Sequence, residues 1–248
     1  MILVLGHPDD PLIREVRRRF STAGEPALCL GETELFTATS LIFEQSRNGC
    51  SGFLRAGDTS VRLDEVSGVL MRLPRLWWPS ADFDLQDQMF VYHECSAAWF
   101  AALNSLCCPV VNRFDLAWWL SDVTYPAALA HDLARQLEVQ ARIDPLPDPL
   151  PPRILPLPPG AGATSLYLAG QAIIPRDSAE SAATGWLQQH ARNLPRWQRE
   201  NGTHLCRVDL GREGEDFFLR HVEIFPLLDG EPAALVSRIA DAAVEMLA

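Results

Sequence analysis

The chain has 248 residues, and its 32 acidic against 21 basic side chains give a formal net charge of −11. This sign excludes nucleic acid as an expected partner, because a phosphate backbone calls for a basic surface. No stretch approaches the roughly 18 apolar residues of a membrane-spanning helix, so we expect no membrane partner either. Every basic side chain is an arginine, which leaves no amine to form a Schiff base and no ammonium to bind a phosphate.

The six cysteines lie in apolar surroundings, and no CxxC spacing occurs among them. This pattern is typical of reduced, buried thiols and not of a disulfide framework. The first apolar segment is followed directly by Asp9 and Asp10, so it predicts a strand and not a signal peptide. We therefore expect a cytoplasmic protein.

The first half of the chain predicts alternating strands and helices. Residues 1–5 form an apolar strand, Pro11 suits the first turn of a helix that runs to Ala23, and 26–30 form a second strand. This strand–helix–strand opening predicts a parallel sheet, because such crossovers are the usual connection between parallel strands. Further predicted elements are a strand at 40–43, a hairpin at 52–63 turning about Ala56-Gly57-Asp58, a strand at 68–73, a helix at 84–107 and a strand at 109–112.

A proline-rich stretch interrupts the second half of the chain. Residues 143–163 contain eight prolines, which excludes a helix and predicts an extended, stiff connector. The elements predicted around it are a helix at 114–139, a hairpin at 164–176 turning at Ala169-Gly170, a helix at 178–200, strands at 204–211 and 217–226, and an amphipathic helix at 231–247.

Several segments together carry a resemblance to a known family. They are "VLMRLP" (69–74), "HECSAAWFAALNSLCCPVVNR" (93–113), "LYLAGQAIIP" (166–175), "LCRVDLG" (205–211) and "RHVEIFPLLDGEP" (220–232). In this order they resemble the ATP-grasp superfamily, in particular the graspetide (microviridin-type) peptide ligases and related glutamate ligases. The resemblance covers most of the chain as an ordered pattern.

The resemblance implies an α/β fold in two parts. A Rossmann-like pre-ATP-grasp domain would occupy 1–113, and a truncated ATP-grasp-like α+β half would occupy 114–248, with the connector 143–163 in place of the family's lid. Asp209 and Glu223 match the positions of the family's two magnesium-binding carboxylates. Arg207 and Arg220 lie beside them as candidate cofactor-binding residues.

The chain departs from the family pattern where the nucleotide binds. Members of the family place two lysines on the nucleotide phosphates, and one of these positions falls here near Ser121 or Asp122. The family's magnesium-binding Asn corresponds to Phe225, which offers no oxygen ligand. We therefore predict a degenerate protein with no cofactor and no ligase chemistry, which binds a peptide or protein partner in a peptide- or protein-modification pathway. The partner could also be a second copy of this chain.

An active ligase is the main alternative. In that hypothesis Asp209 and Glu223 hold magnesium with ATP, and arginines replace the phosphate-binding lysines. An acyl phosphate forms on a carboxylate and an amine then attacks it.

The segment His7-Pro8-Asp9-Asp10 suggests a third hypothesis. A His-Pro-Asp-Asp after a first strand resembles the zinc site of the PIG-L/LmbE-type deacetylases and would imply a zinc-dependent hydrolase. The Glu expected after the Asp pair is replaced by Pro11, and no second histidine cluster follows. The favoured interpretation is therefore a turn in which Asp9 or Asp10 caps the first helix.

Other polar and aromatic residues are candidates for binding the substrate or partner. The ends of predicted parallel strands, where open α/β sheets bind ligands, carry arginines that could hold an acidic group, and a Trp pair could contact a peptide. The candidates are His7, Asp10, Arg72, Arg75, Arg113, Trp77 and Trp78.

Overall fold

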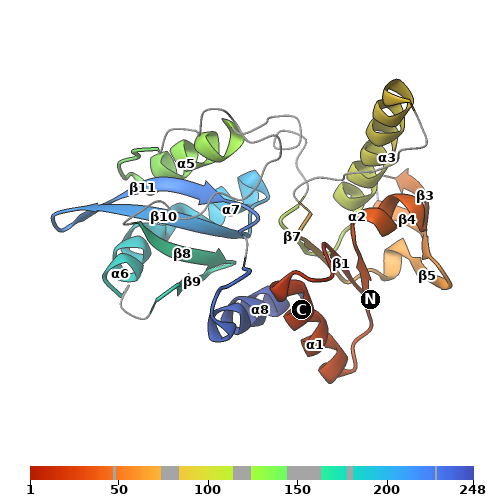
Figure 1. The fold of residues 1–248 in the computed structure, drawn as a ribbon, viewed down its shortest axis with the longest axis horizontal. Helices are drawn as coiled ribbons and strands as arrows, with labels where there is room; N and C mark the ends of the chain where they lie inside the picture. Colours follow the sequence, from red (N-terminus) through yellow and green to blue (C-terminus); the bar gives the residue numbers. More distant parts are fainter. Residues whose placement is uncertain (47–48, 74–83, 114–123, 144–162, 178–180, 227) are drawn as a thin grey trace. The chain divides into compact units, whose positions relative to one another are not determined.

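The computed structural model describes residues 1–46, 49–73, 84–113, 124–143, 163–177, 181–226 and 228–248 (Figure 1). The chain divides into two compact units. The first contains Met1–Phe114 and Val244–Ala248, and the second contains Asp115–Ala243.

The first unit contains a parallel sheet in the strand order β2-β1-β6-β7. Its strands are β1 (Ile2–Leu5), β2 (Ala27–Leu30), β6 (Gly68–Met71) and β7 (Val110–Val111). Leu5 at the end of β1 is aligned with Leu30 on one side and Met71 on the other, so these three strands end at one edge of the sheet. The predicted parallel pairing of the first two strands is confirmed.

Helix α1 (Pro11–Ala23) forms where the sequence predicts it. The Asp10 side chain caps it by accepting a hydrogen bond from the backbone N–H of Leu12, and Pro11 needs no donor at this position. Gly24 ends the helix with φ of 73°, a left-handed conformation that glycine adopts at little cost. The buried stripe of the helix consists of Leu12, Ile13, Val16 and Phe20.

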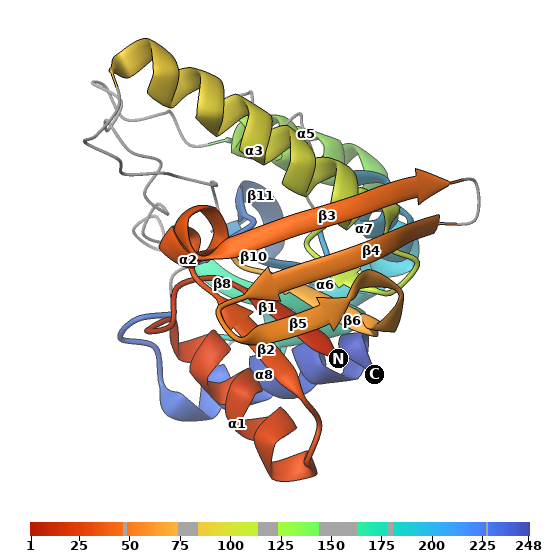
Figure 2. The same ribbon diagram turned by 90° about the vertical axis from the view of Figure 1, so that its right-hand side faces the viewer.

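A second sheet in the first unit is antiparallel (Figure 2). It contains β3 (Thr39–Ser46), β4 (Gly49–Ala56) and β5 (Thr59–Arg62). The last two form the predicted hairpin, and Ala56 pairs with Thr59 across a two-residue turn. Gly57 has φ of 55° in that turn, as the tight turns of hairpins require.

The helices beside this sheet were only partly predicted. Helix α2 (Glu32–Thr37) lies between two predicted strands and was missed, although the Glu34 side chain accepts a hydrogen bond from Gly31 N–H at 2.8 Å at its start. The predicted long helix is present as α3 (Leu85–Ser105), and the Asp84 carboxylate caps it by accepting from the N–H of Asp87.

The second unit is built on an antiparallel sheet in the order β11-β10-β8-β9. Its strands are β8 (Thr164–Ala169), β9 (Ala172–Pro175), β10 (Leu205–Glu213) and β11 (Asp216–Glu223). Both predicted pairs of strands are confirmed, and the β10–β11 hairpin runs beside β8 in Figure 1. A bulge interrupts the β10–β11 ladder between Asp209 and Leu210.

The second half of the chain also carries α5 (Thr124–Leu137), α6 (Ser181–His190), α7 (Leu194–Asn201) and α8 (Ala233–Leu247). Helix α5 packs against β11 and α7, and α6 packs against β9. The single helix predicted at 178–200 is wrong, because a short 3-10 turn at Ala191–Asn193 separates α6 from α7. Pro195 in the first turn of α7 explains this break, since proline cannot continue an α-helix from the preceding turn. The connector predicted at 143–163 falls almost entirely outside the described residues.

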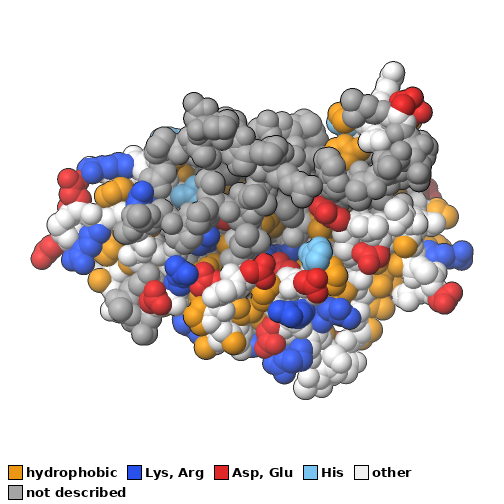
Figure 3. All heavy atoms as spheres, in the orientation of Figure 1, with side chains coloured by type: hydrophobic (Ala, Val, Ile, Leu, Met, Phe, Trp, Pro, Cys, Tyr) orange, Lys and Arg blue, Asp and Glu red, His pale blue; other side chains and the backbone are white. Residues whose placement is uncertain are grey.

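The surface and the cysteines bear on the compositional predictions. None of the described helices is both long and apolar enough to cross a membrane. All six cysteines are free thiols, but the prediction that they are buried is correct only for Cys206: Cys107 is exposed and the other four are partly exposed. On the described part of the face in Figure 3, acidic side chains and arginines are interspersed.

Candidate functional site

Six polar side chains share one face of the sheet in the second unit, and we call them the polar face. Each residue is at most 8% exposed. The polar face consists of Ser165 and Tyr167 on β8, Arg207 and Asp209 on β10, and His221 and Glu223 on β11.

The strand register brings these side chains together. Residues two apart in a strand point to the same side of the sheet, and directly paired residues of antiparallel strands are neighbours on that side. Arg207 pairs with Tyr167 and with Glu223. Asp209 pairs with Ser165 and with His221. The alternate positions of the same strands are apolar and buried: Leu166, Leu168, Val208, Leu210 and Val222.

The centre of the polar face is an ion pair between Arg207 and Asp209. The guanidinium Nε donates to the carboxylate oxygens Oδ1 and Oδ2 at 3.0 and 3.3 Å, and Nη2 donates to Oδ2 at 3.2 Å. The Ser165 hydroxyl donates to Oδ1 at 2.7 Å. The two charged side chains are only 3% and 2% exposed, so they neutralise each other away from water.

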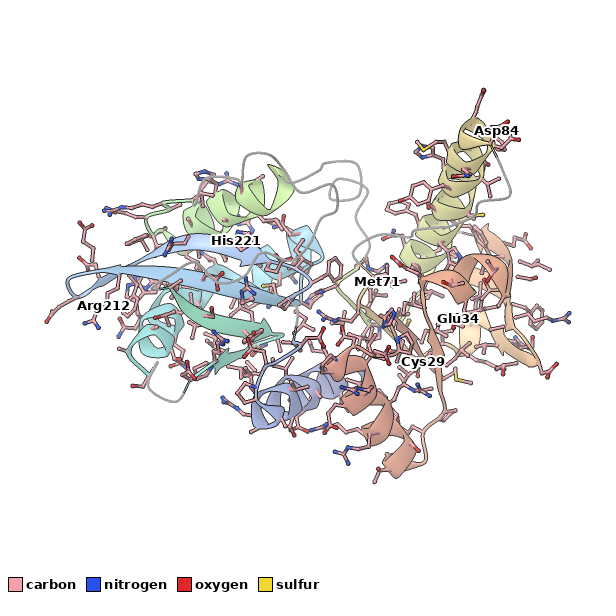
Figure 4. The ribbon with its side chains drawn as sticks, in the orientation of Figure 1. Cys29, Glu34, Met71, Asp84, Arg212 and His221 are labelled. Carbon is pink, nitrogen blue, oxygen red and sulfur yellow. The ribbon has the colours of Figure 1, made fainter. Side chains whose placement is uncertain are left out.

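His221 is the histidine of the polar face, and Figure 4 labels it on β11. Its Nε2 lies 3.5 Å from Oε2 of Glu223, and it makes no hydrogen bond within the described part of the chain. The pair is ionic only when the imidazole is protonated. His221 therefore contributes a buried ring nitrogen directly opposite Asp209.

Tyr167 connects the polar face to the loop that precedes α8. Its hydroxyl donates to Oε1 of Glu231 at 3.3 Å, and Nε of Arg176 donates to Oε2 of the same carboxylate at 3.0 Å. Burial raises the pKa of the Tyr167 phenol well above its ordinary value, and the nearby Glu231 charge raises it further. Tyr167 therefore acts as a hydrogen-bond donor and not as a base.

Arg220 lies at the bulge beside the polar face. The register passes from Asp209–His221 to Leu210–Leu219 and leaves Arg220 without a position in the ladder. Gly211 makes room for the side chains around it, because a Cβ there would lie 2.3 Å from the Phe218 ring and 3.0 Å from Cδ of Arg220. The structure thus places all four sequence-predicted cofactor-binding residues in one region.

The polar face as it stands does not fit a magnesium ion. Magnesium requires hard oxygen ligands in near-octahedral geometry, and the Arg207 guanidinium already binds both oxygens of Asp209. Among the described residues, no group of three or more His, Cys, Asp or Glu side chains is arranged to hold a metal ion.

Asp10 and Arg72 form a second buried ion pair, at the edge of the parallel sheet in the first unit. Nε and Nη2 of Arg72 donate to Oδ2 of Asp10 at 3.0 and 2.7 Å, while Oδ1 of Asp10 caps α1. His7 lies beside them but is exposed, and its Nδ1 accepts a hydrogen bond from the N–H of Asp9 at 3.3 Å. Asp10 thus caps α1, as the capping-turn interpretation expects, and it also binds Arg72, a pairing that the sequence did not predict.

Of the remaining partner-binding candidates, the structure describes only Arg113. Arg113 follows β7, and its Nη1 donates to the backbone oxygens of Leu103 and Asn104 at 3.3 and 3.2 Å, at the end of α3. Arg75, Trp77 and Trp78 lie outside the described residues, as does the position near Ser121 that the resemblance gives to a lysine.

The zinc-hydrolase hypothesis for His7-Pro8-Asp9-Asp10 is not supported. The Asp10 carboxylate is used by the helix cap and by Arg72, and the described residues contain no cluster suited to a metal ion. The interpretation as a capping turn is correct, with Asp10 as the cap and not Asp9.

Sequence reasoning missed three members of the polar face: Ser165, Tyr167 and His221. A signal was available in the alternation of polar and apolar residues on the predicted strands. Leu166 separates Ser165 from Tyr167, and Val222 separates His221 from Glu223. What the sequence did not contain was the pairing of β8 with β10, which brings the three strands side by side.

Comparisons with known proteins concern the fold. No family model and no curated protein sequence matches the chain. The solved macrocyclase MdnC from Microcystis aeruginosa MRC, bound with precursor peptide MdnA, is similar over 99% of this chain and 100% of its own, with a TM-score of 0.65 and 14% identity. A RiPP-associated ATP-grasp ligase from Chryseobacterium gregarium, in complex with ADP and a leader and core peptide, has a TM-score of 0.63 and 11% identity over 99% and 96% of the two chains.

The ATP-grasp ligase PsnB, complexed with a minimal precursor, is similar over 99% of this chain and 98% of its own, with a TM-score of 0.65 and 11% identity. These likenesses establish the fold. The chain has the mixed α/β fold of ATP-grasp ligases, and the predicted resemblance is confirmed at the level of the fold.

Proposed function

We propose that this chain is a peptide-binding component of a peptide-modification pathway and that it does not itself carry out ATP-dependent ligation. The single observation that carries the proposal is the Arg207–Asp209 ion pair. It places an internal cation on the carboxylate that the family resemblance assigns to magnesium. The ATP-grasp fold is retained around it, so the change concerns the chemistry of the site and not the scaffold.

Two features of the sequence support the loss of ligase chemistry. The chain has no lysine, so it lacks the ammonium groups that the family places on the nucleotide phosphates. Phe225 stands where the family has a magnesium-binding Asn, and a phenyl ring has no oxygen to offer a hard cation. A ligase needs the metal to neutralise charge that develops on the transferred phosphoryl group, and these residues do not provide that site.

The proposal of a peptide partner rests on the solved structures of similar fold. Each was determined with a precursor peptide or with a leader and core peptide. Within this chain, Trp77 and Trp78 are the proposed apolar contacts for the peptide. Arg75 and Arg113 are proposed to hold its acidic groups, since guanidinium pairs well with carboxylate.

Isothermal titration calorimetry separates this proposal from the active ligase. Magnesium with ATP is expected to give no binding heat at millimolar concentration, and a peptide encoded beside the gene is expected to bind with a micromolar Kd. Micromolar binding of magnesium-ATP, or its consumption in the presence of the peptide, would establish the ligase alternative instead.

A matched pair of variants tests the proposed peptide contacts. Replacing Trp77 and Trp78 together with Ala is expected to weaken peptide binding at least tenfold, because buried aromatic side chains carry a large share of interface energy. Phe53→Ala is the control, since Phe53 is 50% exposed and lies on β4. Equal losses in the two variants would contradict the assignment of the Trp pair.

A further inference from the structure

We propose that the exposed arginines of α1 form a docking surface for an acidic segment of a polypeptide partner. The surface consists of Arg14, Arg17 and Arg18, and we call it the arginine face. It goes beyond the proposed function, because α1 contributes none of the peptide contacts proposed above.

The arginine face lies on the side of α1 that is turned away from the core of the first unit. Residues three and four apart are neighbours on a helix surface, so Arg14 lies beside both Arg17 and Arg18. All three residues are exposed, whereas the apolar stripe of the helix is buried. Three guanidinium groups are therefore presented to solvent within about one helical turn.

The negative charge on α1 compensates this face only in part. Glu15 is the single acidic residue of the helix, and its carboxylate is shared by Arg18 and Arg19. Arg14 and Arg17 form no ion pair within the described part of the chain. The arginine face therefore keeps a net positive charge, although the whole chain has a net charge of −11.

The arrangement of these charges does not stabilise the helix. Like charges that are three or four residues apart destabilise a helix. Arg14 also lies close to the start of α1, where the positive end of the helix dipole disfavours a cation. A role in binding thus explains the arginine face better than a role in folding.

Charge complementarity favours an acidic polypeptide segment as the occupant. The guanidinium group forms paired hydrogen bonds with carboxylates. A short segment interacts mainly with α1 itself, because charges farther away than about 8 Å are largely screened at physiological salt.

Other polyanions fit this surface less well. A helix that lies on a membrane exposes apolar side chains next to its basic ones, whereas the apolar stripe of α1 is buried. A nucleic acid requires a basic surface that follows its phosphate backbone, and the chain as a whole is acidic.

Fluorescence anisotropy with a labelled peptide of ten glutamates tests the proposal on the full chain. The unsubstituted chain is expected to bind this peptide. Arg14→Gln with Arg17→Gln is expected to weaken binding about fivefold, because exposed ion pairs each contribute modestly. Arg14→Lys with Arg17→Lys keeps the positive charges and is expected to retain most of the affinity.

A matched control removes the same charge from exposed positions outside α1. It is Arg55→Gln with Arg199→Gln, and it is expected to change the affinity less than twofold. Failure of the unsubstituted chain to bind the glutamate peptide overturns the proposal, and so does an equal loss in the two Gln double variants. If Arg14→Gln with Arg17→Gln does not fold, Arg14→Gln alone replaces it, and a loss no larger than that of Arg55→Gln alone decides against the proposal.

Two further probes are vesicles of phosphatidylglycerol and a single-stranded DNA of ten nucleotides. Tighter binding of either than of the glutamate peptide, with a loss in Arg14→Gln plus Arg17→Gln, assigns the arginine face to a membrane or to nucleic acid and overturns the proposal. The measurement does not depend on Trp77 or Trp78, so failure of the proposed function is distinguished from failure of this docking surface.

Discussion

Among the described residues, each unit contains an Arg–Asp ion pair that is buried or partly buried, and the two pairs differ in what they connect. Arg72 and Asp10 are 62 residues apart and join the end of β6 to the start of α1. Arg207 and Asp209 are two residues apart on one strand, so the bond between them joins no distant positions of the chain. The first pair is therefore a tertiary link, and the second neutralises charge within a strand.

The acidic partners also differ in how they would tolerate the loss of their arginine. The Asp10 side chain is 15% exposed, and it accepts the N–H of Leu12 at a helix start, where a negative charge is favourable. Asp209 is 2% exposed, and besides the Arg207 guanidinium it accepts a hydrogen bond from the Ser165 hydroxyl. A tertiary link can thus be less costly to break than a local pair, because burial of the remaining charge decides the cost.

The sharpest test of this comparison is Arg207→Met. It is expected to lower the free energy of unfolding by about 3–5 kcal/mol, the range for an uncompensated buried charge. Urea denaturation followed by circular dichroism measures the change. Adding Asp209→Asn is expected to restore more than half of the loss, since both charges are then absent. A double variant no more stable than Arg207→Met would show that the cost comes from lost packing and not from charge.

The matching change in the first unit is Arg72→Met. It is expected to cost about 2 kcal/mol, less than Arg207→Met, because water and the start of α1 continue to stabilise the Asp10 carboxylate. The same denaturation experiment measures it. If Arg72→Met proves the more destabilising of the two, the tertiary link outweighs the burial of the remaining charge, and the comparison is reversed.

The smallest expected effect concerns an ion pair that is both local and closer to the surface. Glu15 on α1 accepts hydrogen bonds from Arg18 and Arg19. Mainly through the bond from Arg18, its pKa is lowered from 4.5 to about 2. A carboxyl with a lowered pKa in the folded state adds stability above its unfolded pKa, and this stability is lost as the pH falls from about 4.5 to about 2.

Glu15→Gln is therefore expected to flatten the dependence of the unfolding free energy on pH within that window. At pH 7 it is expected to cost about 0.5 kcal/mol, as is usual for helix-surface pairs. Urea denaturation at pH 7, 4 and 3 measures both effects. A loss that is the same at all three pH values would contradict the assigned role of the Glu15 charge.

Local sequence signals predicted much of the fold. Pro11 and Gly24 bounded α1, the Gly57 and Gly170 turns marked two hairpins, and the order of motifs indicated the ATP-grasp fold that the structure confirms. These signals depend on the backbone preferences of a few neighbouring residues, and such preferences follow directly from the residue types in the sequence. The helix α2 and the break between α6 and α7 were mispredicted, because short helices carry too few residues to show a periodic pattern.

The sequence by itself determined the ligand chemistry that the chain can offer, because the absence of lysine and the presence of Asp209, Glu223 and Arg207 are facts of composition and spacing. Only the tertiary structure decided how those groups are used. The register of β8, β10 and β11 places Ser165 and His221 beside Asp209. The Arg207 side chain is buried with Asp209 and pairs with its carboxylate. Strand pairing and burial depend on residues far apart in the chain, and for that reason spacing along the sequence did not reveal them.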